Sequence, residues 1–134
     1  MKEVLVDTDT LSYFLRNVPE VMAHADRYLR VHRGFTFSVI TGFEIIRGLK
    51  VKAASRQLES FASIRSLSKL LHVTEPTVEI AADIYARLSV GGKRIGDADI
   101  LIAATAIENG LALVTNNEGH FERIPGLELL NWSR

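Results

Sequence analysis

The sequence predicts an α/β fold built around a mainly parallel sheet of four or five strands. Short apolar runs alternate along the chain with longer stretches of helical spacing, which is typical of strand-helix units around such a sheet. The 134 residues, of which 47% are apolar, suffice for one sizeable core. We therefore expect a single domain over residues 1–134, without a linker, an internal repeat or a low-complexity segment.

Five short apolar runs are the expected strands of this sheet. The first opens the chain, and the last is expected to be a short strand at the edge of the sheet. The five runs are residues 4–6, 35–39, 70–73, 111–114 and 127–130.

Six segments between these runs are expected to form helices. The fifth starts at Pro76, a residue favoured in the first helical turn, and ends at Gly91-Gly92. Its apolar stripe is expected to comprise Val78, Ala81, Ala82, Tyr85 and Leu88. The other five helices are expected near residues 9–15, 19–31, 41–50, 53–67 and 98–109.

The composition excludes several classes of site. The chain has no cysteine, which rules out disulfides, thiolate metal sites and a cysteine nucleophile. Sixteen basic and sixteen acidic residues balance, so the protein is no polycation that coats nucleic acid non-specifically. No apolar run approaches the roughly 18 residues of a membrane span. The charged start, with Asp7 following directly, does not resemble a signal peptide, so we expect a cytoplasmic protein without membrane contact.

Several polar residues follow strand ends or open helices, where ligands bind in open α/β sheets. Asp7 follows the first strand, and Glu44 lies in the first turn of the helix after the second strand. Asp97 and Asp99 open the last long helix. Thr115, Asn116 and Asn117 follow the fourth strand. We expect all of these residues at one edge of the sheet.

Each of these residues also has a purely structural interpretation. Thr41 and Glu44 fit a capping box, and Asp9 and Asp97 are natural N-caps. Asn117 fits a cap for a short segment leading toward Phe121.

Their coincidence at one edge favours a metal site. Two carboxylates about 4 Å apart repel by about 4 kcal/mol at an effective dielectric of 20, so several together are costly. A divalent cation offsets this repulsion, and Mg²⁺ prefers oxygen ligands of this kind. Such an ion can orient water and stabilise charge on phosphoryl oxygens, which favours phosphodiester hydrolysis.

Four motifs together resemble the VapC-type PIN domain, in the family's order and over nearly the whole chain. They are residues 4–9, Ser38 with residues 44–48, residues 97–106, and residues 113–117 continuing through His120-Phe121 to residues 124–127. The resemblance implies a three-layer α/β/α sandwich and a Mg²⁺- or Mn²⁺-dependent endoribonuclease toxin that cleaves RNA. It also implies a homodimer that is neutralised by a cognate antitoxin protein.

The resemblance assigns roles by position. Asp7, Glu44 and Asp99 match the family's first three acids, as catalytic and metal-binding residues. Asn117 stands where many members have a fourth acid, so Asn117 and Asp97 are candidates for additional or water-mediated metal contacts. Thr8, Ser38 and Thr115 lie within the matching motifs as supporting residues.

Basic residues flank the expected site in two groups. The first group, beyond Glu44, comprises Arg47, Lys50, Lys52 and Arg56, and the second, before Asp97, comprises Lys93 and Arg94. Both groups are candidates to bind an RNA backbone. The four histidines show no metal-ligand spacing and none lies beside a serine it could activate. We assign no role to His24, His32, His72 or His120.

Two alternatives remain open. Residues 7–9 and 96–99 also resemble the nucleophile loop and the metal motif of a haloacid-dehalogenase-like phosphatase. Leu11 stands where that family has Thr or Val, and Thr115 follows the late acids rather than preceding them. The second alternative is a non-catalytic PIN-like binding module, against which the presence of all three acids counts. A phospho-receiver domain is less favoured than either alternative, because Glu75-Pro76 follows the third strand in place of a phosphorylatable Asp.

Overall fold

The computed structural model describes residues 1–92 and 94–134, and the RNA-binding role expected for Lys93 lies outside the described residues. Every expected strand and helix is present, with strands that are mostly shorter than expected, and a short helix, α7, is added. Within the described residues, no helix is both long and apolar enough to cross a membrane. The elements in chain order are β1 (Val4–Val6), α1 (Thr8–Leu15), α2 (Pro19–Leu29), β2 (Thr36–Ser38), α3 (Val39–Val51), α4 (Ser55–Leu67), β3 (Lys69–Leu71), α5 (Glu75–Val90), α6 (Asp97–Glu108), β4 (Ala112–Val114), α7 (Glu118–Phe121) and β5 (Leu129–Leu130).

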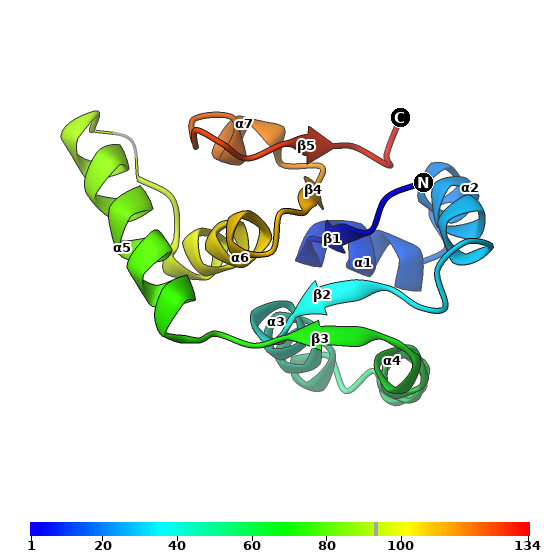
Figure 1. Ribbon diagram of the computed structural model, residues 1–134. Coiled ribbons are helices and arrows are strands. Elements are labelled where there is room, and N and C mark those ends of the chain that lie inside the picture. Colours follow the sequence, from blue (N-terminus) through cyan, green and yellow to red (C-terminus); the bar gives the residue numbers. More distant parts are fainter. Residues whose placement is uncertain (93) are drawn as a thin grey trace.

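The strands form one parallel layer in the order β3-β2-β1-β4-β5 (Figure 1). Strand β4 pairs in parallel with β1 on one side and with β5 on the other, and β2 pairs in parallel with β3. Strands β1 and β2 lie side by side and join the two hydrogen-bonded groups. Because all the strands run the same way, their carboxyl ends meet at one edge of the layer.

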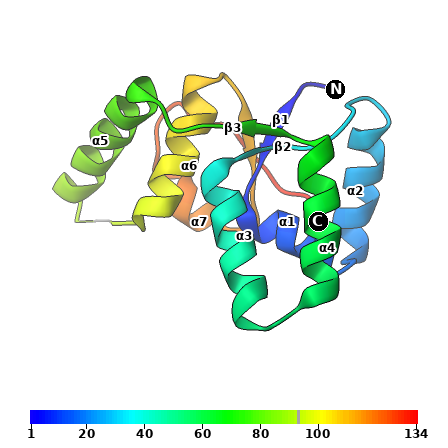
Figure 2. The same cartoon turned by 90° about the horizontal axis from the view of Figure 1, so that it is seen from below.

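Two apolar cores cover the two faces of this sheet. Because side chains alternate along a strand, Leu5 points to one face and Val4 and Val6 point to the other. Leu5 and Leu113 pack with α5, α6 and α7, whereas Val6 and Val114 pack with α1, α2, α3 and α4 (Figure 2). The expected α/β/α sandwich with a mainly parallel sheet is therefore confirmed.

The buried face of α5 differs from the expected stripe. Val78 and Tyr85 are 54% and 45% exposed, and Ala82 is also exposed. The buried side chains of α5 are instead Thr77, Ala81, Ile84 and Leu88, which face α6. The Thr77 hydroxyl donates to the Glu108 carboxylate at the end of α6, and this polar contact helps to set the rotation of α5.

Candidate active site at the carboxyl edge of the sheet

Asp7 is the buried acid at the centre of the carboxyl edge. It follows β1 directly and is the N-cap of α1, where its Oδ1 accepts a 2.8 Å hydrogen bond from the Thr8 backbone N–H. Its Oδ2 accepts a 2.8 Å hydrogen bond from the Thr115 hydroxyl, which follows β4. With only 4% of its surface exposed, Asp7 is fixed in position at the floor of the site.

The surroundings of Asp7 disfavour its negative charge. Burial raises the pKa of Asp7 from its usual 3.8 to about 7, and the nearby charges of Asp9 and Asp99 act in the same direction. The hydrogen bonds from Thr115 and Thr8 oppose this rise only in part. A positive charge placed beside Asp7 would therefore be strongly stabilising.

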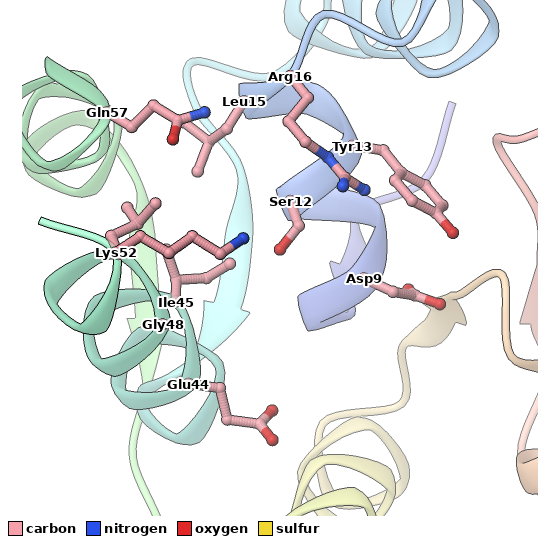
Figure 3. Close-up of a pocket in the computed structure, with 11 residues that line it drawn as sticks. Asp9, Ser12, Tyr13, Leu15, Arg16, Glu44, Ile45, Gly48, Lys52 and Gln57 are labelled. Atoms are coloured by element: carbon pink, nitrogen blue, oxygen red, sulfur yellow. The ribbon is translucent and has the colours of Figure 1, made fainter. Parts of the chain in front are cut away.

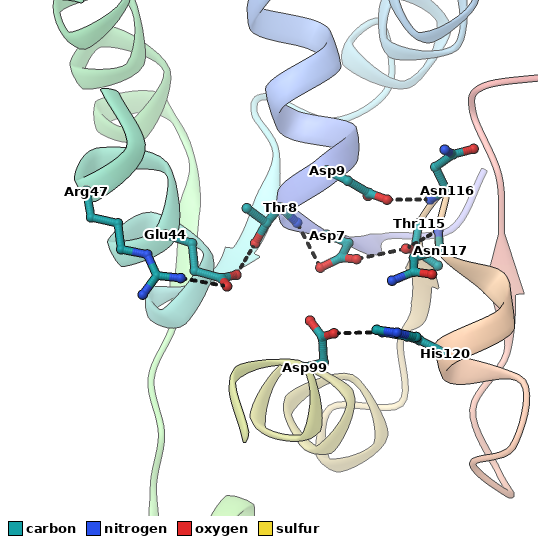
Figure 4. A network of polar contacts seen from close by, with 10 residues as sticks. All are labelled: Asp7, Thr8, Asp9, Glu44, Arg47, Asp99, Thr115, Asn116, Asn117 and His120. Carbon is teal, nitrogen blue, oxygen red and sulfur yellow. Dashed lines mark hydrogen bonds and ion pairs between the residues drawn. The ribbon is translucent and has the colours of Figure 1, made fainter. Parts of the chain in front are cut away.

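Glu44 reaches the same edge from α3. Its Oε1 accepts a 2.6 Å hydrogen bond from the Thr8 hydroxyl, so one residue of α1 contacts both acids (Figure 4). Its Oε2 lies 3.7 Å from the Arg47 guanidinium one turn along the helix. The Glu44 side chain is 18% exposed, so it lies nearer to the solvent than Asp7.

Asp99 approaches from the first turn of α6, opposite Glu44 (Figure 4). Its Oδ2 lies 3.1 Å from His120 Nδ1 on α7. The sequence assigns no role to His120, because its separation of 21 positions from Asp99 matches no ligand spacing. The contact depends on α7 folding back over α6, which no local pattern predicts.

Asp9 is a further acid beside the site, and sequence reasoning missed it. The interpretation of Asp9 as an N-cap is wrong, because Asp7 is the cap and Asp9 lies within the first turn of α1. Its Oδ2 accepts a 3.1 Å hydrogen bond from the Asn116 backbone N–H, which ties α1 to the segment after β4. Burial, with a smaller effect from Asp99, raises the pKa of Asp9.

Two other capping interpretations are also wrong. Helix α3 begins at Val39 and is capped by Ser38, whose hydroxyl accepts from the Ile40 backbone N–H, so Thr41 lies inside the helix. Ser38 is thus a buried cap of the helix that carries Glu44. The N-cap of α6 is Gly96, and Asp97 is an exposed first-turn residue rather than a cap.

Asn117 lies at the same edge, next to Thr115. Its backbone N–H donates to the Thr115 hydroxyl at 3.0 Å, so that hydroxyl accepts from Asn117 while it donates to Asp7. Asn117 stands at the N-cap of α7 but makes no side-chain capping bond there. The Asn117 side chain therefore does not cap α7, and its exposed amide is available at the edge.

The basic residues expected to bind RNA differ in their surroundings and contacts. Arg47 stacks over Phe43 at 5.0 Å while it pairs with Glu44, so its charge is directed at the acidic edge. Lys50 is exposed on α3. Arg94 lies over the ring of Tyr85 on α5, 5.9 Å from its centroid.

The donor chemistry of the edge fits a hard divalent cation. Asp7, Glu44 and Asp99 come from three separate segments and face a common space lined by oxygen atoms (Figure 4). Among residues 1–92 and 94–134, no three acidic or histidine side chains converge to coordination distance, and Glu44 and Asp99 contact Thr8 and His120 respectively. A bound cation would offset the burial and the neighbouring negative charges that raise the pKa of Asp7.

Comparisons with known proteins match this architecture. The model of the PIN domain family matches residues 4–127. Ribonuclease VapC1 of Methanocaldococcus jannaschii is 32% identical over 122 residues, which cover 91% of this chain and 81% of that protein. The tRNA(fMet)-specific endonuclease VapC of Salmonella typhimurium is 32% identical over 133 residues, 98% of this chain and 99% of its own. Among solved structures, DNA-bound VapBC from Salmonella typhimurium superimposes with a TM-score of 0.86 at 31% identity, covering 98% of this chain and 99% of that one.

Proposed function

This chain belongs to the PIN-domain family, and from that premise we propose that it is an endoribonuclease of the VapC type that hydrolyses RNA with a divalent metal ion. The observation that carries the proposal is the meeting of Asp7, Glu44 and Asp99 at one edge, with Asp7 buried and its pKa raised. The family assignment favours the nuclease over the phosphatase alternative. The presence of all three acids favours an enzyme over a binding module.

The three acids take different positions in this proposal. Asp7 is the anchor at the floor, fixed by Thr8 and Thr115. Glu44 and Asp99, with side chains 18% and 25% exposed, lie at the rim, where a phosphate can approach. A Mg²⁺ or Mn²⁺ ion bound between them would orient water and stabilise the charge of the phosphoryl oxygens.

Supporting residues hold the acidic side chains in position. The Thr8 hydroxyl positions Glu44, while the Thr115 hydroxyl restrains Asp7. Asn117 and Asp97 remain candidates for water-mediated contacts at the rim. Ser38 contributes by starting the helix that carries Glu44.

The proposed partners follow from the relatives. VapBC structures are complexes described for relatives of this chain, so we propose a cognate antitoxin that neutralises it. We also propose that residues 1–134 act as one domain, that the protein is a homodimer and that it works in the cytoplasm. Light scattering after size exclusion tests the dimer, and a single mass of 14.9 kDa would contradict it.

The activity assay separates nuclease from phosphatase. Purified protein is incubated with single-stranded RNA and, in parallel, with a generic phosphate monoester, each with MnCl₂ or with EDTA. We expect RNA cleavage in MnCl₂ alone and no release of phosphate from the monoester. Release of phosphate without RNA cleavage would contradict the proposed function.

A further inference from the structure

A groove leads away from the acidic edge between α1 and α3. Its cavity volume is about 360 Å³, and Asp9 and Glu44 lie at one end of it (Figure 3). Farther along, Arg16 at the end of α1 and Lys52 at the end of α3 line the walls. We call this the α1–α3 groove. It thus begins with acids and continues with cations.

Helix periodicity accounts for this order of charges. Glu44, Gly48 and Lys52 are spaced four residues apart, so they share one face of α3. Asp9 and Arg16 are seven residues apart, about two turns, and share a face of α1. At about 1.5 Å of rise per residue, each cation lies roughly 10–12 Å along its helix from the acid.

The two cations are free to take a ligand. Within the part of the chain that the structure describes, no carboxylate lies within the 4.0 Å of an ion pair with Arg16 or Lys52. The Arg16 guanidinium lies 5.1 Å over the ring of Tyr13, which restrains its position. The amino group of Lys52 points across the groove toward α1 (Figure 3). Arg47, by contrast, pairs with Glu44.

The floor of the groove between acid and cation is open. Gly48 stands between Glu44 and Lys52, and a Cβ placed there would meet no atom within 4 Å. Ser12 lies on the opposite wall, and its hydroxyl is available to a polar ligand. An extended polyanion can therefore run along this path without meeting a bulky side chain at Gly48.

We propose that Arg16 and Lys52 bind the backbone of the RNA substrate at a phosphate beyond the cleaved bond. This rests on the proposed function. With about 3.4 Å of axial spacing per nucleotide in a stacked strand, the 10–12 Å offset places this phosphate roughly three nucleotides from the acidic edge. The two cations act as positioning residues that hold the strand along the groove, while the acids face the cleaved phosphate.

Arg30 provides a matched control for a purely structural role. Arg16, Lys52 and Arg30 are the C-cap residues of α1, α3 and α2, where a positive charge complements the helix dipole. Arg30 is exposed and does not line the groove. If the charges serve only their helix ends, Arg16→Gln and Arg30→Gln should behave alike.

The test measures RNA binding and cleavage separately. Binding of fluorescent single-stranded RNAs of several sequences is titrated in EDTA at a series of salt concentrations, and cleavage kinetics are measured in MnCl₂. The proteins are the parent, Arg16→Gln, Lys52→Gln, Lys52→Arg and Arg30→Gln. Melting curves confirm that each variant is folded.

We expect Arg16→Gln and Lys52→Gln each to weaken binding for every sequence. Each should lower the slope of log affinity against log salt by about 0.7, the value for one phosphate of a single strand. KM should rise while kcat stays near the parent value. Lys52→Arg and Arg30→Gln should behave like the parent.

Parent-like affinity and salt slope in both glutamine variants would overturn the inference, as would equal losses in Arg30→Gln. A parent that cuts RNA while the variants are unaffected would contradict the groove assignment alone.

A parent that binds RNA through these cations without cutting it would contradict the proposed function alone. A parent that binds no RNA overturns both. If the variants keep their RNA affinity but no longer bind a neutralising antitoxin, the groove belongs to a protein partner and the inference is wrong.

Discussion

Asp7 and Thr115, separated by 108 positions in the sequence, are joined by a 2.8 Å hydrogen bond from the threonine hydroxyl to Oδ2. The bond connects the end of β1 to the end of β4. It lowers the pKa of Asp7 and so opposes the effect of burial, which raises that pKa. The ionisation of the central acid thus depends on a side chain from a distant segment.

Replacement of Thr115 by Val should raise the pKa of Asp7 further and shift the acidic limb of the pH–rate profile to higher pH. The variant keeps the shape of the side chain but leaves Oδ2 without its donor, at a cost of about 1–3 kcal/mol in unfolding free energy. Thr115→Ser, which retains the hydroxyl, should restore the parent profile. Superimposable profiles for Val and parent would show that the bond does not control Asp7.

The metal-free protein should lose stability as the pH rises from about 4 to 7. The pKa of Asp7 is raised from 3.8 to about 7 on folding, so in this window the folded state holds a proton that the unfolded state has released. The contribution of Asp7 protonation to the free energy of unfolding is complete below pH 3.8 and lost above about pH 7. It is on the order of a few kcal/mol. Urea unfolding in EDTA at pH 5 and pH 8 measures it.

The control for this prediction is Asp7→Asn, which cannot ionise. Its stability relative to the parent should increase between pH 5 and pH 8, because only the parent acquires the buried charge. A constant difference between the two proteins would mean that Asp7 ionises as easily as an exposed carboxyl.

Replacement of Asp99 by Asn and replacement of Asp97 by Asn should have clearly different effects on the rate of RNA cleavage. Asp99 faces the common space with His120 behind it, so Asp99→Asn should lower the cleavage rate at least about a hundredfold. Asp97 is exposed and caps nothing, so Asp97→Asn should change stability by less than about 1 kcal/mol and affect cleavage only weakly. Melting curves and cleavage rates of the matched pair test this, and an Asp97 variant that is stable but inactive would reverse the assignment.

Asn117→Asp should tighten Mn²⁺ binding. Asn117 is anchored to Thr115 at the acidic edge, and a carboxylate there would add charge beside the proposed ion. Calorimetric titration with MnCl₂ compares the variant with the parent. An unchanged affinity would place the Asn117 side chain outside the influence of the metal.

The location of the acids was predictable because it follows from chain order and parallel topology. Asp7 comes after a strand, Asp99 lies in the first turn of α6, and Glu44 lies in the second turn of α3 because that helix begins at Val39, earlier than the sequence predicts. In a parallel sheet such positions converge, so the short apolar runs were sufficient to place them.

His120, Asp9 and the face of α5 were not predictable in the same way. The Asp99–His120 contact requires α7 to lie over α6, and the Asp9–Asn116 contact requires the turn after β4. On α5, Tyr85 and Ile84 both fit a helical stripe, and only packing against α6 buries Ile84. Side-chain partners and helix rotation are tertiary properties, which a periodic pattern does not determine.

The most direct test of the acidic edge as a metal-dependent ribonuclease site is the rate of RNA cleavage as a function of MnCl₂ concentration for the parent and for Asp7→Asn. The proposed function predicts a parent rate that saturates with MnCl₂ and falls to background in EDTA, while folded Asp7→Asn stays at background throughout. Equal cleavage by the parent in EDTA, or a rate near that of the parent in Asp7→Asn, would contradict it.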